Sequence, residues 1–233
     1  MTTITLMFTK REFTGPLLYL IDRLLPPIVR DSFVFKYLFG SDMFKKDIID
    51  STPEELKKYY ISDSYIKRPT DITKKALKKI MFFISESNLL NPKICDVGGG
   101  NLFLAKKIIK DFNYTTDVID FLIEDDENIK RIEYKLEKKL DFIEDNYYEI
   151  CISTHTVEHL LNSSSFVNEI RRISNYGFVL LFPKQRPYKY TPDTHINFYP
   201  YIFEVEKLVG KIDGDKKMLV DLKYDWLYLE KLS

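Results

Sequence analysis

Short apolar runs alternate with segments of helical periodicity from Pro92 to the end of the chain. Short apolar runs bounded by turn residues are typical of buried strands, and strands that alternate with helices form a parallel sheet with crossover helices. The expected strands are residues 93–97, 115–121, 129–136, 147–153, 176–183 and two more within 217–232, and the expected helices are 102–112, 164–174 and 202–212. The pattern therefore predicts an α/β fold with a doubly wound, mostly parallel sheet.

Residues 1–90 differ in pattern and composition, because they look helical and are rich in aromatic side chains. Proline and glycine interrupt them at Gly15-Pro16, Pro26-Pro27, Gly40, Pro53 and Pro69, so we expect several short helices. Within 71–87 the apolar residues recur at helical spacing and predict an amphipathic helix. We therefore expect an N-terminal helical cap over residues 1–90 and an α/β domain over residues 91–233.

The charge balance limits the partners of the protein, since 35 basic side chains face 35 acidic ones. Nucleic-acid binding usually needs a basic surface, because the neutralisation of phosphates supplies much of the affinity. We therefore expect no nucleic-acid partner. The longest apolar stretch, residues 16–39, is interrupted by charges and by two prolines before it reaches the roughly 20 residues that span a bilayer. We expect it to be a buried lid, a dimer contact or a peripheral membrane contact, and not a transmembrane segment.

The two cysteines indicate a reducing environment. Cys95 and Cys151 each lie in an apolar run just before a loop, which predicts buried thiols in core strands and not a disulfide framework. The first residues also lack the apolar core and cleavage site of a secretion signal. A cytoplasmic location is therefore expected.

A glycine cluster between the first expected strand and its helix is the most informative motif. It runs from Asp96 through Gly98, Gly99 and Gly100 to Asn101. Glycine allows a sharp turn at the carboxyl end of a strand and lets a ligand approach the backbone closely. Asp96 would place a carboxylate beside an ammonium group or a ribose. Such a cluster can also be a plain tight loop, so its position after a strand is what favours a cofactor site.

Asp120 ends the second expected strand. An acidic residue at this place can accept two hydrogen bonds from the hydroxyls of a ribose. The alternative is a solvated strand-end aspartate, and Asp117 or Glu124 would take the role if the strand ended elsewhere.

Four segments, 96–101, 118–121, 147–160 and 168–183, resemble in their order and spacing the class I S-adenosylmethionine-dependent methyltransferases. The resemblance implies a Rossmann-like sheet of seven strands with S-adenosyl-L-methionine as cofactor. In that family the glycine turn holds the methionine end, the acid after the second strand holds the ribose, and a residue after the third strand lies beside the adenine. The implied cofactor-binding residues are Asp96, Gly98, Gly99, Gly100, Asn101, Asp120, Glu137, Thr154 and His155. Leu102 stands where the family pattern has a third glycine, so we expect a slightly reshaped pocket.

The three histidines of the chain, His155, His159 and His195, are the candidate catalytic bases, because a neutral imidazole suits proton transfer near pH 7. His159 could instead be a structural residue at the edge of the sheet. His155, Glu158 and His159 also spell the H-x-x-E-H pattern of certain zinc peptidases, in which both histidines bind the metal from one helix. Here the motif directly follows an expected strand and its first part is predicted to be loop, so we expect no metal.

The segment around His195 resembles one in methyltransferases that act on small molecules and glycans. The resemblance implies O-methylation of a small polar acceptor, such as a sugar, a glycan precursor or a metabolite. A chain that keeps the fold as a non-catalytic binding scaffold is the alternative.

Overall fold

The computed structural model describes residues 11–39, 45–61, 70–121, 126–136, 138–187, 189 and 193–232. It contains a seven-stranded sheet with the order β3-β2-β1-β4-β5-β7-β6. The strands are β1 (Ile94–Val97), β2 (Thr116–Asp120), β3 (Lys130–Glu133), β4 (Tyr148–Thr154), β5 (Ser174–Pro183), β6 (Lys217–Asp221) and β7 (Asp225–Lys231). The predicted strands and the predicted fold class are confirmed.

The order of the strands creates a switch point beside β1. The chain moves outward from β1 through β2 to β3 and then returns to place β4 on the other side of β1, and all of these pairs are parallel. Only β7 runs antiparallel to its neighbours β5 and β6. Because the carboxyl ends of β1, β2 and β4 meet at one edge, the loops that follow them converge there. In open α/β sheets this is where ligands bind.

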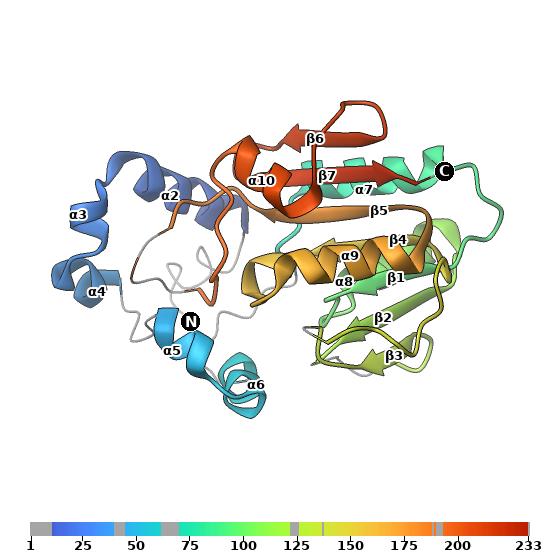
Figure 1. Ribbon diagram of the computed structural model, residues 1–233, viewed down its shortest axis with the longest axis horizontal. Coiled ribbons are helices and arrows are strands. Elements are labelled where there is room, and N and C mark those ends of the chain that lie inside the picture. Colours follow the sequence, from blue (N-terminus) through green and yellow to red (C-terminus); the bar gives the residue numbers. More distant parts are fainter. Residues whose placement is uncertain are drawn as a thin grey trace.

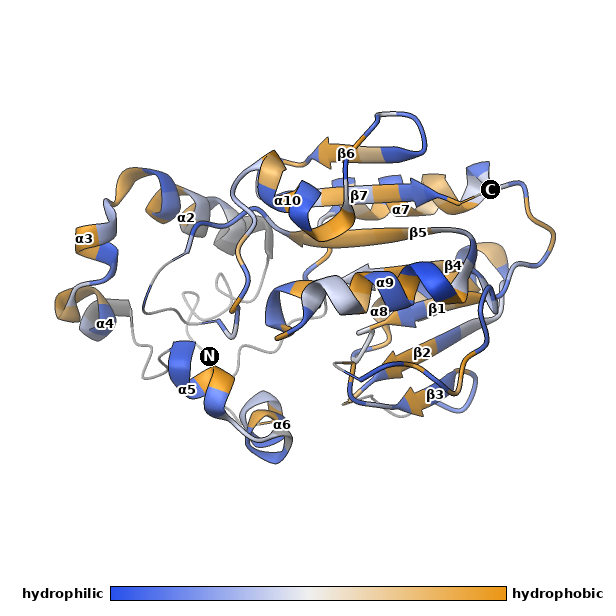
Figure 2. Cartoon of the chain, viewed as in Figure 1, coloured by the Kyte–Doolittle hydropathy of each residue, from blue (hydrophilic) through white to orange (hydrophobic). Residues whose placement is uncertain are grey.

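Helices cover both faces of the sheet (Figure 1). One face packs against α7 (Lys74–Glu86) and α8 (Phe103–Phe112), and the other against α9 (Ser163–Ile173) and α10 (Ile202–Val209). Side chains alternate along each strand, so Cys95 and Phe178 join the α9 face while Ile94 and Val179 join the α7 face. In Figure 2 the strands are mainly hydrophobic, whereas α9 has hydrophilic residues on its outer side. This is the doubly wound arrangement that the alternation predicts.

Cys95 and Cys151 are free and fully buried on the adjacent strands β1 and β4, as predicted. Helix α7 lies in the region 1–90, but its apolar side chains Ile80 and Ile84 belong to the core of the sheet. Its first turn is capped by Thr73, whose side chain accepts a hydrogen bond from Ala76 N.

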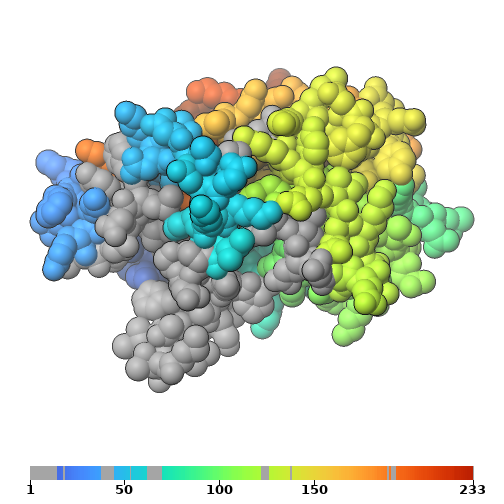
Figure 3. Space-filling model, turned by 90° about the horizontal axis from the view of Figure 1, so that it is seen from below, coloured from blue at the N-terminus to red at the C-terminus, as the bar shows by residue number. Residues whose placement is uncertain are grey.

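Figure 1 shows the remaining N-terminal helices beyond the carboxyl ends of the parallel strands. Four of those described are short, as predicted, but the first continues through Gly15-Pro16, where the sequence predicts an interruption. They are α2 (Arg11–Leu24), α3 (Pro27–Arg30), α4 (Phe33–Phe39), α5 (Lys45–Asp50) and α6 (Pro53–Ile61). The start of α6 is a capping box in which Thr52 and Glu55 exchange hydrogen bonds. Seen from below, α6 adjoins the segment that carries β3 (Figure 3). An ion pair joins Lys57 of α6 to Glu133 of β3. Among the described residues, no helix combines the length and the apolar character that a bilayer crossing requires.

Candidate functional site

The turn after β1 is held tightly between its neighbours. Gly98 has φ +86°, a conformation that disfavours any residue with a side chain, and an added Cβ would lie 2.1 Å from Oγ1 of Thr156. Its N–H donates to the carbonyl of Ile119 at the end of β2 over 2.7 Å. The loop after β4 and the end of β2 therefore both touch the glycine turn.

Asp96 is a buried carboxyl group at the base of this turn, and 1% of its surface is exposed. Its Oδ2 faces Gly99, where an added Cβ would lie 2.4 Å away, and its Oδ1 has no hydrogen-bond partner within the described part of the chain. Burial, and then the charge of Asp120, raise the pKa of Asp96 to about 7. A buried carboxyl group with an unused oxygen is costly and would be stabilised by a cationic or hydrogen-bond-donating ligand.

Asp120 points toward the same turn. Its Oδ2 accepts a hydrogen bond from Gly100 N over 2.9 Å, and its Oδ1 accepts one from Phe121 N over 2.6 Å. These bonds fix the carboxylate at the switch point. The substitute Asp117 is engaged elsewhere, because its Oδ2 accepts a hydrogen bond from the buried hydroxyl of Tyr148 over 2.9 Å.

Other predicted cofactor residues lie at the margins of this site. Asn101 is exposed, and its side chain accepts a hydrogen bond from Phe103 N. Thr154 ends β4 and His155 follows it with φ +53°, so both lie beside Thr156 at the glycine turn. Glu137 and the substitute Glu124 lie outside the described residues.

Leu102, which replaces the third glycine of the family pattern, has φ +58° at the start of α8. This left-handed conformation costs a residue with a side chain about 1–2 kcal/mol. The side chain is fully buried and packs with Ala105, Val118 and Ile129. Leu102 therefore keeps the backbone shape of a glycine while its side chain becomes part of the core.

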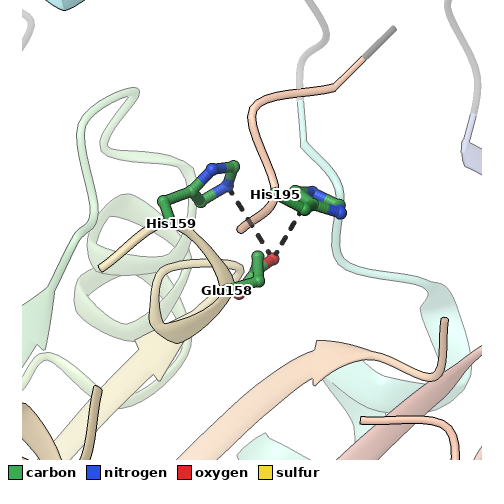
Figure 4. A group of neighbouring side chains, drawn as sticks. All are labelled: Glu158, His159 and His195. Atoms are coloured by element: carbon green, nitrogen blue, oxygen red, sulfur yellow. Dashed lines mark ion pairs between the residues drawn. The ribbon is translucent and has the colours of Figure 1, made fainter. Parts of the chain in front are cut away.

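The three predicted catalytic histidines meet at one carboxylate. Glu158 lies in the 3-10 helix η1 (Val157–His159) directly after β4 and is fully buried. Its Oε1 is 3.3 Å from Nδ1 of His155 and 3.9 Å from Nε2 of both His159 and His195, and Figure 4 shows the last two rings on either side of the carboxylate. The sequence motifs give no sign that Glu158 is the shared centre.

The charges of this cluster follow from its burial. Burial alone would raise the pKa of Glu158, but the neighbouring imidazoles, His155 first, lower it below its ordinary value. Burial lowers the pKa of His195 to about 4, so this ring is neutral near pH 7. The cluster is therefore a buried carboxylate beside at least one neutral imidazole.

Backbone hydrogen bonds bring the segment after β5 to this place. The N–H groups of Ile196 and Asn197 both donate to the carbonyl of Glu158, over 2.8 and 3.0 Å. The side chain of Asn197 also donates to the carbonyls of Val157 and Leu160. Asn197 thus joins two segments that are far apart in the sequence, and this places the neighbouring His195 beside Glu158.

Helix α6 contributes a residue that sequence reasoning missed. The hydroxyl of Tyr60 hydrogen-bonds Oγ1 of Thr194 over 2.7 Å, and its ring contacts those of Phe121 and His159. No local pattern marks Tyr60, because its role depends only on how α6 packs against the sheet.

The arrangement of the H-x-x-E-H residues differs from that of a zinc peptidase. Those enzymes place both histidines on one face of an α-helix. Here His155 precedes a 3-10 helix of three residues that includes Glu158 and His159. The prediction that the motif begins in a loop is confirmed.

No protein-family model matches the chain, and no curated protein matches it in sequence. Among solved structures, the PH0226 protein of Pyrococcus horikoshii OT3 is 16% identical over 75% of this chain and 98% of its own, with a TM-score of 0.50. A SAM-dependent methyltransferase from Aquifex aeolicus is 14% identical over 79% of this chain and 100% of its own, with a TM-score of 0.49.

A putative methyltransferase from Bacillus halodurans C-125 is 18% identical over 46% of this chain, with a TM-score of 0.38, and the chain spans about half (51%) of its length. Likeness at such low identity concerns the fold alone. The strand order and the antiparallel β7 lead to one conclusion about the fold. The chain has the Rossmann-like, seven-stranded fold of the class I S-adenosylmethionine-dependent methyltransferases.

Proposed function

We propose that the protein is an S-adenosylmethionine-dependent methyltransferase whose cofactor binds at the carboxyl ends of β1 and β2. The observation that carries this proposal is the buried Oδ1 of Asp96, which lacks a hydrogen-bond partner within the described residues and belongs to a glycine turn at the switch point. A ligand with a positive charge would satisfy this oxygen, and S-adenosylmethionine carries both an ammonium group and a sulfonium.

Different residues would bind different parts of the cofactor. Asp96 and the turn Gly98–Gly100 would bind the methionine end, and Asp120, held by Gly100 N, would accept hydrogen bonds from the ribose. Asn101, Thr154, His155 and Glu137 complete the proposed set. When bound, S-adenosylmethionine supplies a methyl group on a positively charged sulfur.

We assign the histidine cluster around Glu158 to the acceptor side of the site. Thr156 packs on Gly98, and Glu158 follows Thr156 by two residues, so the cluster adjoins the glycine turn in space. The proposed reaction is O-methylation of a small polar acceptor such as a sugar, a glycan precursor or a metabolite, and the histidines would assist removal of the hydroxyl proton. The part of residues 1–90 that precedes α7 would act as a cap, since Tyr60 from α6 contacts both Phe121 and Thr194.

Calorimetric titration with S-adenosylhomocysteine, the demethylated product, tests the proposal. We expect binding to the unmodified chain and its loss in Asp96→Ala and Asp120→Ala. Asp141→Ala is the matched control, because Asp141 is an exposed aspartate whose contact is an ion pair with Lys139. Transfer of labelled methyl groups into a cell extract would then identify the acceptor. If neither S-adenosylmethionine nor its product binds the folded chain, the proposal is wrong.

A further inference from the structure

We propose that Glu158, His159 and His195 form a binding site for one divalent transition-metal ion of the zinc type. Each side chain offers one ligand atom, and the three atoms lie within 4.8 Å of one another (Figure 4). From the sequence we expect no metal, and the zinc-peptidase pattern would use His155 and His159. In the proposed site Glu158 is itself a ligand, and His195 from a distant segment takes the place of His155.

The first argument is the state of the Glu158 carboxylate. Its exposed fraction is 0%, and neither of its oxygens has a hydrogen-bond partner within the described part of the chain. A buried carboxylate in this state is expensive, and native structures normally satisfy it with hydrogen bonds or a cation. The groups that face Oε1 are imidazole nitrogens, Nδ1 of His155 at 3.3 Å and Nε2 of His159 and His195 at 3.9 Å, so nitrogen donors surround the carboxylate.

The second argument is the orientation of His195. Its Nδ1 lies 2.6 Å from Oε1 of Gln185, and the amide of Gln185 is oriented by donating from Nε2 to Asp193. Since an amide oxygen only accepts, Nδ1 of His195 carries a proton, and Nε2 is the nitrogen turned toward Glu158. Nε2 of the singly protonated ring is free to bind a metal ion that lies between it and the carboxylate.

His159 is oriented in the same way. Its Nδ1 lies 2.8 Å from Oγ1 of Thr194, which is also bonded to the hydroxyl of Tyr60. Nε2 of His159 is therefore the nitrogen turned toward Glu158, at 3.9 Å. Histidines that bind metals almost always use the other ring nitrogen to hydrogen-bond a residue of this kind, which fixes the ring and its tautomer. Both rings thus have the outer support that a metal site needs.

The donor set and its spacing select the class of metal. Two imidazole nitrogens and one carboxylate oxygen suit Zn²⁺ and its transition-metal neighbours, whereas Mg²⁺ and Ca²⁺ prefer oxygen ligands alone. Ligands about 2.0–2.1 Å from a tetrahedral zinc ion are about 3.4 Å apart. The observed separations of 3.9 Å between Oε1 and each Nε2 would shorten by small side-chain movements on binding.

The site is accessible from the histidine side, where the side chains of His159 and His195 are 24% and 14% exposed. Three protein ligands leave a tetrahedral metal one open position. An oxygen of the methyl acceptor would occupy it, and metal coordination lowers the pKa of a bound hydroxyl group. This role in the reaction rests on the proposed function, whereas the metal site itself does not.

Metal titration of the full chain tests the site. After treatment with a chelator and dialysis, we expect one Zn²⁺ to bind per chain by calorimetry and Co²⁺ to produce the visible absorption of a bound ion. His159→Ala and His195→Ala should each weaken Zn²⁺ binding more than about 100-fold, the upper end of the loss expected for an outer residue. Thr194→Val leaves all three ligands in place and should weaken binding by about 10- to 100-fold.

His155→Asn is the matched control, because asparagine tolerates the positive φ of this position. It should retain Zn²⁺ binding within the range of an outer residue. Circular dichroism of each variant will show that it is folded. The proposal is overturned if the unmodified chain binds no Zn²⁺, or if His155→Asn abolishes binding while His195→Ala preserves it. Zn²⁺ binding without S-adenosylhomocysteine binding would support the metal site and refute only the proposed methyl transfer.

Discussion

Replacing Asp96 with asparagine should make the stability of the protein less dependent on pH. The pKa of Asp96 rises from an ordinary 3.8 to about 7, first because of burial and then because of Asp120. At about 1.4 kcal/mol per pH unit, this difference corresponds to at most about 4 kcal/mol. Because the pKa is raised in the folded state, the stability that Asp96 contributes is complete below pH 3.8 and is lost as the pH rises through 7.

The assay is urea denaturation of the unmodified chain and of Asp96→Asn at several pH values between 4.5 and 8.5. Asparagine does not titrate, so the free energy of unfolding of the variant, relative to the unmodified chain, should increase across this range by about 3 kcal/mol. If the amide itself changes the free energy of unfolding by a constant amount, the change of this difference with pH is unaffected. Asp141→Asn, on an exposed side chain, should follow the unmodified chain at every pH. If the difference between Asp96→Asn and the unmodified chain is the same at pH 5 and pH 8.5, the carboxyl group is not buried as described.

Three further substitutions test the backbone and the join between segments. Gly98→Ala adds a Cβ 2.1 Å from Thr156 at positive φ, so it should lower the free energy of unfolding by about 2 kcal/mol or more, and an unchanged melting temperature would contradict the geometry. Leu102→Gly relieves about 1–2 kcal/mol of strain but removes a buried side chain worth more, so a net loss is expected in denaturation and a gain would refute it. Asn197→Ala removes the side-chain donor to the carbonyls of Val157 and Leu160, and it should cost about 1–3 kcal/mol and also weaken Zn²⁺ binding. Intact Zn²⁺ affinity would show that Asn197 does not position His195.

The fold could be predicted from the sequence because it depends on local periodicity. Most of the strands are apolar runs bounded by turn residues, and α8 and α9 connect β1 to β2 and β4 to β5. The short edge strand β3 has mostly exposed residues and still pairs as expected. The glycine turn and Asp120 were predictable for a related reason, since each lies at the end of a strand and the topology brings those ends together.

The histidine cluster could be predicted only in part. The motif marks Glu158 and His159 as neighbours in sequence, but their contact with His195 depends on two N–H groups that bond the carbonyl of Glu158. The position of Tyr60 depends on the packing of α6. Long-range contacts of this kind produce no periodic pattern in the sequence. The histidines could therefore be predicted as candidates, but their common contact with the carboxylate of Glu158 could not.

Tyr60 contacts both the proposed cofactor side of the site, next to Asp120, and the histidine cluster. Its ring meets Phe121, the residue after Asp120, while its hydroxyl holds Thr194 beside His159. A molecule that moves α6 while binding near Asp120 must also disturb the support of His159, and the reverse holds for a molecule that binds near the histidines. Such coupling is reciprocal: if the first ligand changes the affinity for the second by some factor, the second changes the affinity for the first by the same factor. The affinities for two reactants would then be coupled through one side chain that contacts both halves of the site.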